Sequence, residues 1–211
     1  MIDARQMPTT AGYAEAAETL AGQYESVSFA DVHRDTLHLL PTRPATVLDI
    51  GAGSGRDAAA LAALGHRVVA VEPTAELRAL GRKIHADQDI EWVDDALPGL
   101  PALRGRGDGP ERRFELILLT AVWMHLDAGQ RTAAMGALAG LLAAEGQVVL
   151  SLRHGPVPAG RRMFDVSADE TVRLGRDHGL RRVHRSERPD PHGRPGVSWS
   201  HLVLRRGAAG R

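Results

Sequence analysis

Three glycines at alternate positions, Gly51, Gly53 and Gly55, follow a short apolar run over residues 45–50. The run lacks polar alternation, which is typical of a strand buried on both faces of a parallel sheet. Glycine adopts positive φ and lets another group approach the bare backbone, so this turn can present main-chain N–H groups to a ligand. An alanine-rich segment beginning at Arg56 predicts a helix whose first-turn amides point the same way. The stretch indicates a platform for a small, nucleotide-like molecule.

The spacing of these glycines separates the turn from two other nucleotide-binding motifs. A dinucleotide fingerprint, G-x-G-x-x-G, would need glycine where Arg56 stands, and a P-loop would need G-x-x-x-x-G-K-[ST]. The segment D-I-G-A-G-S-G at residues 49–55 instead resembles motif I of the class I S-adenosylmethionine-dependent methyltransferases. The resemblance implies that Asp49 holds the loop and the amino acid end of S-adenosylmethionine, with S-adenosylhomocysteine as product. It covers residues 45–204 and is most specific over 47–96.

Two further acidic positions support this interpretation. Glu72 ends an apolar run at 68–71, about twenty residues beyond the turn, where an acid can accept hydrogen bonds from both ribose hydroxyls. Asp94 and Asp95 follow a short predicted strand at 90–93, and they resemble the landmark whose acid accepts from the adenine amino group. Asp95 is the better candidate by register, and Asp94 is the substitute. The expected cofactor-binding residues are Asp49, Gly51, Ala52, Gly53, Gly55, Arg56, Glu72, Pro73, Asp94, Asp95, Ala96, Thr120, Ala121 and Val122.

Catalytic candidates are expected where the predicted strands 114–120 and 147–152 end, because ligands of open α/β sheets lie beyond the carboxyl ends of strands. His125 is the first candidate for a general base or substrate-orienting group, since imidazole titrates near pH 6.5. His154 is its rival. The alternative for His125, which lies among apolar neighbours, is an ordinary hydrogen bond to a nearby loop. The resemblance implies that the N-terminal helices close over the substrate, so Tyr13, Tyr24 and His33 are expected substrate-binding residues, although Tyr24 could equally serve to pack those helices. Trp123 and Arg153, which lie at the ends of the two strands, are also expected to bind substrate.

The order of predicted elements indicates an α/β fold. Strands alternate with helices five or six times, and the last two strands, at 180–186 and 197–204, come as a pair. We expect a Rossmann-like, doubly wound sheet of about seven strands, mostly parallel with an antiparallel last strand, preceded by N-terminal helices over 9–22 and 28–40. Residues 99–112 are interpreted as a surface loop.

The expected domain organisation has three parts. These are a helical cap over 1–43, a cofactor-binding domain over 44–206 and a tail over 207–211.

Composition argues against several classes of partner and cofactor. The 211 residues carry no net charge, which argues against a nucleic-acid or membrane partner. There is no cysteine, and the ten histidines form no H-x-x-x-H cluster, so no metal is expected. The sequence shows neither a signal-peptide pattern nor an apolar run long enough to span a membrane, and we therefore expect a cytoplasmic protein. We expect it to be a monomer or a homodimer.

The leading hypothesis is therefore a methyltransferase acting on an O, N or S nucleophile of a small molecule. No [DN]-P-P-[YF] motif follows the fourth strand, and cytosine C5 chemistry would need a cysteine, so nucleic acid is not the expected acceptor. Three alternatives stay open. Gly55, Arg56 and Asp57 resemble the G-R-N opening of thiol and tellurite methyltransferases, and an NAD-dependent oxidoreductase or a non-catalytic nucleotide-binding protein would use a related fold.

Overall fold

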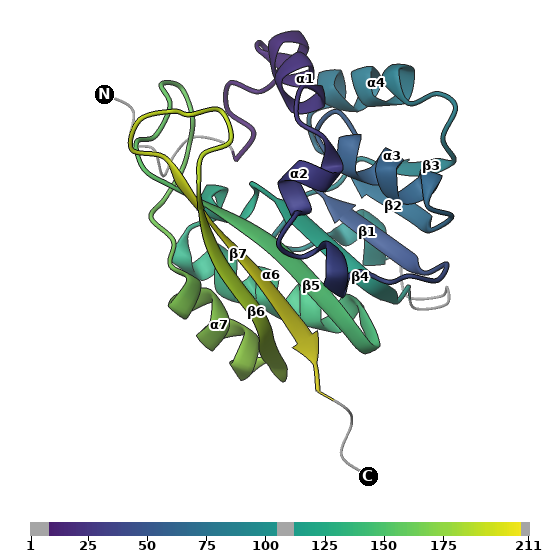
Figure 1. Cartoon of the computed structure of the whole chain (residues 1–211), viewed down its shortest axis with the longest axis vertical. Helices are drawn as coiled ribbons and strands as arrows, with labels where there is room; N and C mark the ends of the chain where they lie inside the picture. Colours follow the sequence, from purple (N-terminus) through teal and green to yellow (C-terminus); the bar gives the residue numbers. More distant parts are fainter. Residues whose placement is uncertain (1–8, 105–111, 208–211) are drawn as a thin grey trace.

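A seven-stranded sheet organises the computed structural model, which describes residues 9–104 and 112–207 (Figure 1). The strand order is β3-β2-β1-β4-β5-β7-β6. β7 runs antiparallel to both of its neighbours, β5 and β6, and all other neighbouring strands pair in parallel. The predicted mostly parallel sheet with an antiparallel last strand is therefore confirmed. The strands are β1 Thr46–Ile50, β2 Arg67–Val71, β3 Ile90–Val93, β4 Phe114–Thr120, β5 Leu142–His154, β6 Leu180–Pro189 and β7 Ser198–Arg206.

The direction of strand addition reverses between β1 and β4, which pair in parallel at the centre of the sheet. At such a switch point the connections leave toward opposite faces and open a crevice at the carboxyl ends of the strands. The glycine turn follows β1, and the segment containing His125 follows β4. The topology therefore brings the two sequence-predicted site segments to one edge.

Helices cover both faces of the sheet (Figure 1). Side chains of β4 alternate between two cores, with Ile117 and Leu119 facing α6 and α7, and Leu116 and Leu118 facing α2 and α3. This double burial explains the continuous apolar run of that strand. The helices are α1 Ala17–Glu25, α2 Phe29–His33, α3 Arg56–Ala63, α4 Ala75–Ile84, α5 Pro101–Arg104, α6 Ala128–Leu141 and α7 Ala168–Asp177, with 3-10 turns η2 Leu37–Leu39 and η3 Trp123–His125.

The N-terminal helices differ from the prediction. Instead of spanning 9–22, α1 begins at Ala17 and continues through Gly22 to Glu25. A Cβ added at Gly22 would contact no other atom, so this glycine does not mark the end of the helix. Instead of spanning 28–40, α2 stops after five residues. The carbonyl of His33 accepts both the backbone N–H and the hydroxyl of Thr36, which closes a turn there. The chain then continues into η2.

Two other boundaries were predicted wrongly. The helix expected to reach residue 144 ends at Leu141, and β5 begins at the next residue. The start of β5 is irregular: Glu145 has left-handed φ, and the pairing with β4 shifts register there. The expected surface loop at 99–112 contains α5, and its Leu100 and Leu103 are buried in the core. Residues 105–111 of that loop, residues 1–8 and residues 208–211 of the tail lie outside the described residues. The domain boundary at residue 43 stays a prediction.

No helix in the described ranges is long and apolar enough to cross a membrane.

Candidate functional site

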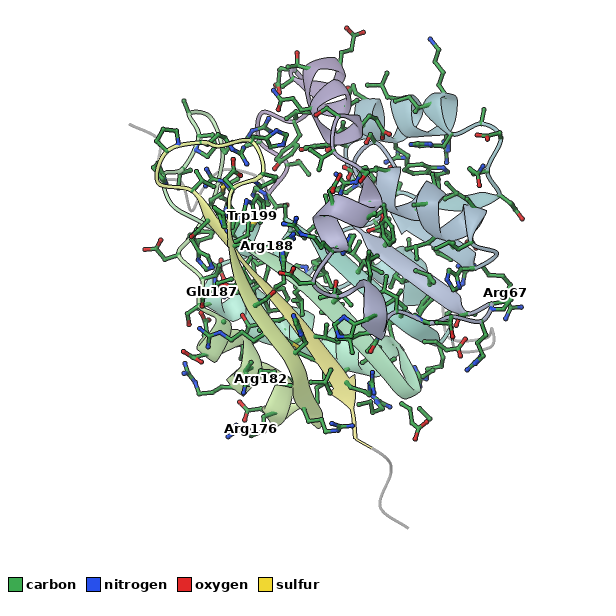
Figure 2. The ribbon with its side chains drawn as sticks, in the orientation of Figure 1. Arg67, Arg176, Arg182, Glu187, Arg188 and Trp199 are labelled. Atoms are coloured by element: carbon green, nitrogen blue, oxygen red, sulfur yellow. The ribbon has the colours of Figure 1, made fainter. Side chains whose placement is uncertain are left out.

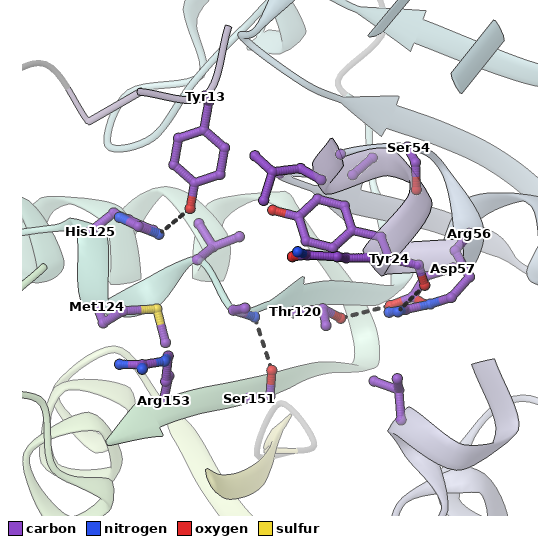
Figure 3. A pocket seen from close by; sticks show the side chains of 18 of the residues that line it. Tyr13, Tyr24, Ser54, Arg56, Asp57, Thr120, Met124, His125, Ser151 and Arg153 are labelled. Atoms are coloured by element: carbon purple, nitrogen blue, oxygen red, sulfur yellow. Dashed lines mark hydrogen bonds and ion pairs between the residues drawn. The ribbon is translucent and has the colours of Figure 1, made fainter. Parts of the chain in front are cut away.

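A cavity of about 810 Å³ lies at the carboxyl edge of the sheet, between the ends of β1, β2, β4 and β5 and the N-terminal segment (Figure 3). Ligand cavities in proteins typically span about 300–1,000 Å³. Sequence-predicted residues that line it are Tyr13, Tyr24, Asp49, Gly51, Ala52, Gly53, Arg56, Glu72, Pro73, Asp95, Ala96, Thr120, Ala121, Val122, His125 and Arg153. The fold thus brings together most residues singled out from three separate motifs.

The glycine turn is held by the end of β2. The carbonyl of Val71 accepts hydrogen bonds from Gly51 and Ala52, and Glu72 accepts one from the N–H of Gly53 at 2.8 Å. Gly51 and Gly53 both have left-handed φ, at 69° and 58°. A Cβ on Gly53 would lie 3.1 Å from the ring of Tyr24, so this glycine also permits a close contact with the N-terminal segment.

Three acidic side chains line the same half of the cavity, each from the end of a parallel strand. Asp49 is 1% exposed, one of its carboxylate oxygens has no partner, and burial together with the neighbouring Asp57 raises its pKa well above the ordinary value. Burial also raises the pKa of Glu72, whose two oxygens accept from the backbone N–H groups of Gly53 and Thr74. A cationic ligand group against Asp49 would stabilise its ionised form.

The two adjacent acids at the end of β3 point in different directions. Asp95 is buried and lines the cavity, and its carboxylate accepts hydrogen bonds from the backbone N–H groups of Ala96 and Leu103. Asp94 is exposed and forms an ion pair with Arg78. The structure therefore places Asp95 at the cavity and leaves Asp94 outside it, because successive residues of an extended chain face opposite sides.

Asp57 is a buried site residue that the sequence reasoning missed. It accepts hydrogen bonds from His33 at 2.8 Å, from Arg56 at 2.7 Å and from the hydroxyl of Thr120 at 2.7 Å. Burial alone would raise its pKa, but the charges and hydrogen bonds of His33 and Arg56 hold the pKa well below the ordinary value. The signal was present, since Asp57 lies four residues before the buried Leu61 on the same face of α3.

A second hydrogen-bonded pair stands at the opposite half of the cavity. The hydroxyl of Tyr13 lies 2.9 Å from Nε2 of His125, whose Nδ1 lies 2.6 Å from the carbonyl oxygen of Arg162 (Figure 3). A carbonyl only accepts, so Nδ1 carries the hydrogen and Nε2 accepts from Tyr13. Burial lowers the pKa of His125 and raises that of Tyr13, which keeps both groups neutral at neutral pH.

Besides Asp94, four of the expected site residues lie outside the cavity lining. His33 forms a hydrogen bond with the carboxylate of Asp57. Trp123 is fully buried in the core. The turn at Gly55 packs against the ring of Trp92. His154 bonds the hydroxyl of Ser200. It follows Arg153 on β5, and because strand residues alternate, Arg153 and Ser151 face the cavity while His154 does not.

The segment after β4 shapes the half of the cavity that contains Tyr13 and His125. Ala121 has φ of 61°, and its N–H donates to the hydroxyl of Ser151 at 2.9 Å. This left-handed residue turns the chain so that Val122, Met124 and His125 face the cavity. Ser151 and Met124 were not predicted, although Ser151 shares the period of two with Arg153 on β5.

The N-terminal segment is fixed over the cavity at several points. Glu25 accepts hydrogen bonds from the hydroxyl of Ser54 at 2.6 Å and from His85 at 3.2 Å. Arg56 donates to the carbonyl of Tyr24 at 3.1 Å. Residues 13 and 24 of this segment therefore contact the two different halves of the cavity.

Fold and site together define an α/β protein that holds a nucleotide-like small molecule at a switch point. A family model described as a methyltransferase domain matches residues 24–193, and the chain belongs to this family. A comparison with curated protein sequences finds no match.

Several solved structures share the fold. A TehB-like SAM-dependent methyltransferase from Corynebacterium glutamicum has 20% identity and a TM-score of 0.64, covering 92% of this chain and 99% of its own. The 1,6-didemethyltoxoflavin N1-methyltransferase of Burkholderia thailandensis, solved with 1,6-didemethyltoxoflavin and S-adenosylhomocysteine, has 23% identity and a TM-score of 0.60, with 98% and 97% covered. The N-methyltransferase NodS of Bradyrhizobium japonicum, solved with S-adenosylhomocysteine, has 16% identity and a TM-score of 0.65, with 92% and 97% covered.

Proposed function

We propose that this protein is an S-adenosylmethionine-dependent methyltransferase whose acceptor is an O, N or S nucleophile of a small molecule. One observation carries the proposal: three buried acids, Asp49, Glu72 and Asp95, face one cavity beside a turn of left-handed glycines. Family membership and the ligands of the solved relatives support it. A cavity of about 810 Å³ suits a small-molecule acceptor better than a nucleic acid. Cytoplasmic location and a monomeric or homodimeric state stay predictions.

The residues present fit this cofactor. The unpartnered oxygen of Asp49 is available to an amino group, which would remove the cost of a buried acceptor without a donor. Each oxygen of Glu72 has one backbone donor and keeps a second lone pair, so the carboxylate can still accept from ribose hydroxyls. Asp95 and Ala96 line the same cavity, and we assign contact with the adenine ring to them.

When bound, S-adenosylmethionine supplies an electrophilic methyl group, so the protein has mainly to align the acceptor and exclude water. We assign proton removal from the acceptor to His125, because its Nε2 carries no hydrogen at neutral pH and can take up a proton. The hydroxyl of Tyr13 lies against that nitrogen and relays the proton. The Tyr13 oxygen takes the acceptor's proton as its own hydrogen passes to Nε2, so Tyr13 stays neutral.

Binding measurements test the proposed function directly. By calorimetry, the protein should bind S-adenosylhomocysteine with micromolar affinity and should not bind NAD, which separates it from an oxidoreductase. Glu72→Ala should weaken binding by about 10- to 100-fold, because a hydrogen bond to a charged group contributes about 1.5–3 kcal/mol. NAD binding in the absence of S-adenosylhomocysteine binding would refute the proposal.

The role of His125 predicts a pH profile. The pKa of His125 is lowered, so turnover should fall only when the pH drops below about 6.5, the ordinary histidine value, as the imidazole becomes protonated. His125→Ala should lower kcat by about 100-fold or more at unchanged cofactor affinity. His154→Ala is the matched control, since His154 lies at the same edge of the sheet but outside the cavity. Wild-type turnover in His125→Ala would leave alignment alone as the mechanism.

A further inference from the structure

Charged side chains of both signs line the cavity, and two of its arginines, Arg56 and Arg188, are each paired with an aspartate. The acids Asp49, Glu72 and Asp95 line the half beside the glycine turn. Arginines line the half that contains Tyr13 and His125, and they come from β5 and from the segments that follow β5 and β6. Those arginines are Arg153, Arg161 and Arg194. The first half suits the cationic cofactor of the proposed function, and the second half must be explained by a different group.

Arg153 is the most confined of these cations. It is 9% exposed, its Nη1 donates to the carbonyl of Pro156 at 2.9 Å, and its Nε has no partner. It forms no ion pair within the described parts of the chain. Burial lowers its pKa, and the nearby Arg194 lowers it further. A buried guanidinium without a counter-ion is costly, and an anion bound beside it would remove that cost.

Arg161 lines the same cavity, and like Arg153 it acts electrostatically on both Tyr13 and His125. Its guanidinium carbon lies 3.8 Å from the centre of the Tyr13 ring. Among the described residues the guanidinium makes one hydrogen bond, to the carbonyl of Ala11, which is long at 3.4 Å. No carboxylate in the described ranges pairs with it. Both Arg153 and Arg161 are near enough to His125 to help lower its pKa, after burial. In Figure 3, Arg153 and His125 lie on either side of Met124, below Tyr13.

The carboxylate that acts electrostatically on Arg153, Asp190, already has several hydrogen-bond donors of its own. Asp190 accepts hydrogen bonds from the side chain and the backbone N–H of Arg194, from the indole N–H of Trp199 and from the backbone N–H of His192. Its charge is therefore balanced by Arg194. Asp190 acts on Arg153 at longer range but does not pair with it. The two guanidinium groups of Arg153 and Arg161 are left for a ligand.

We propose that the methyl acceptor is a small molecule with an anionic oxygen group, carboxylate or phosphate in type, that binds between Arg153 and Arg161. This inference rests on the proposed function and names its substrate class. Guanidinium groups match the geometry of both oxyanions, and two of them in a confined cavity would hold the anion firmly. Held there, the rest of the acceptor lies beside the Tyr13 and His125 pair.

Calorimetry on the full-length protein saturated with S-adenosylhomocysteine tests this class of acceptor. The probes are benzoate, phenylphosphonate and the neutral benzamide, which share one ring. Either anion should bind about tenfold or more tightly than benzamide, and the tighter of the two tells carboxylate from phosphate. Arg161→Gln and Arg153→Lys should each reduce that preference, and Arg153→Gln with Arg161→Gln together should abolish it.

Arg67→Gln is the control, because Arg67 lies at the opposite end of its strand, far from Arg188 and Trp199 (Figure 2). It should keep the full preference for the anions. Affinity for S-adenosylhomocysteine should be unchanged in all variants, which shows that they fold and keeps this test separate from that of the cofactor. Equal binding of anions and benzamide, no binding of either anion, or a preference that survives the double variant would overturn the proposal.

Discussion

Gly53→Val should abolish detectable binding of S-adenosylhomocysteine, a loss of at least about 100-fold, or about 2.7 kcal/mol. Gly53 has φ of 58°, a conformation that costs a β-branched residue about 1–3 kcal/mol. Its first side-chain carbon would also lie 3.1 Å from the ring of Tyr24, so either the ring or the turn must move. Movement of the turn would break the hydrogen bond from Gly53 to Glu72. Calorimetry and thermal unfolding of the same sample measure the two effects.

Gly65→Val is a matched control for backbone strain. Gly65 also has left-handed φ, at 86°, but no atom lies within contact distance of its added carbon. This variant should lose a similar amount of stability while binding S-adenosylhomocysteine as the wild type does. Equal loss of binding in both variants would show that strain alone is responsible and that Gly53 has no particular role at the cavity.

Asp57→Ala should lower the free energy of unfolding by about 3–5 kcal/mol, the cost of removing one partner from a buried charged network. His33, Arg56 and Thr120 all donate to this carboxylate, and each would lose its acceptor in a buried setting. Denaturant titration measures the loss. Asp94→Ala removes an exposed carboxylate paired with Arg78 and should cost less than about 1 kcal/mol.

The pKa of Asp57 adds a pH signature to this comparison. The folded-state pKa lies below the unfolded value of about 3.9, so the carboxylate stabilises the fold fully above that value. This contribution is lost as the pH falls from about 3.9 toward the folded-state pKa. The wild type should therefore lose more stability than Asp57→Ala over that acidic range. Parallel curves for the two proteins would contradict the assigned network.

The central sheet could be predicted because its signals are local. The glycine turn after β1 and the acids at the ends of β2 and β3 are set by spacing along the chain, and the lining of the cavity includes Glu72 and Asp95 as expected. Orientation within an element was harder to predict. His154 and Trp123 occupy the expected segments, but strand alternation and the turn η3 direct them away from the cavity.

Contacts between distant segments were beyond the sequence patterns. Nothing local to Asp57 indicates that His33 and Thr120 would meet it, because those contacts depend on how α2 packs beside α3 and β4. The same holds for Tyr13, which lies 112 residues from His125 along the chain. Sequence reasoning placed Tyr13 in the pocket from the family resemblance and His125 from its position after a strand, and it did not pair them.

The N-terminal segment contacts both halves of the cavity, so we expect it to couple them thermodynamically. Tyr24 covers the glycine turn, and Tyr13 of the same segment contacts His125, with Glu25 tying the segment to Ser54. A ligand that orders this segment in one half reduces the entropy that the other ligand must still lose on binding. The resulting cooperativity is reciprocal: the factor by which the cofactor tightens acceptor binding equals the factor by which the acceptor tightens cofactor binding.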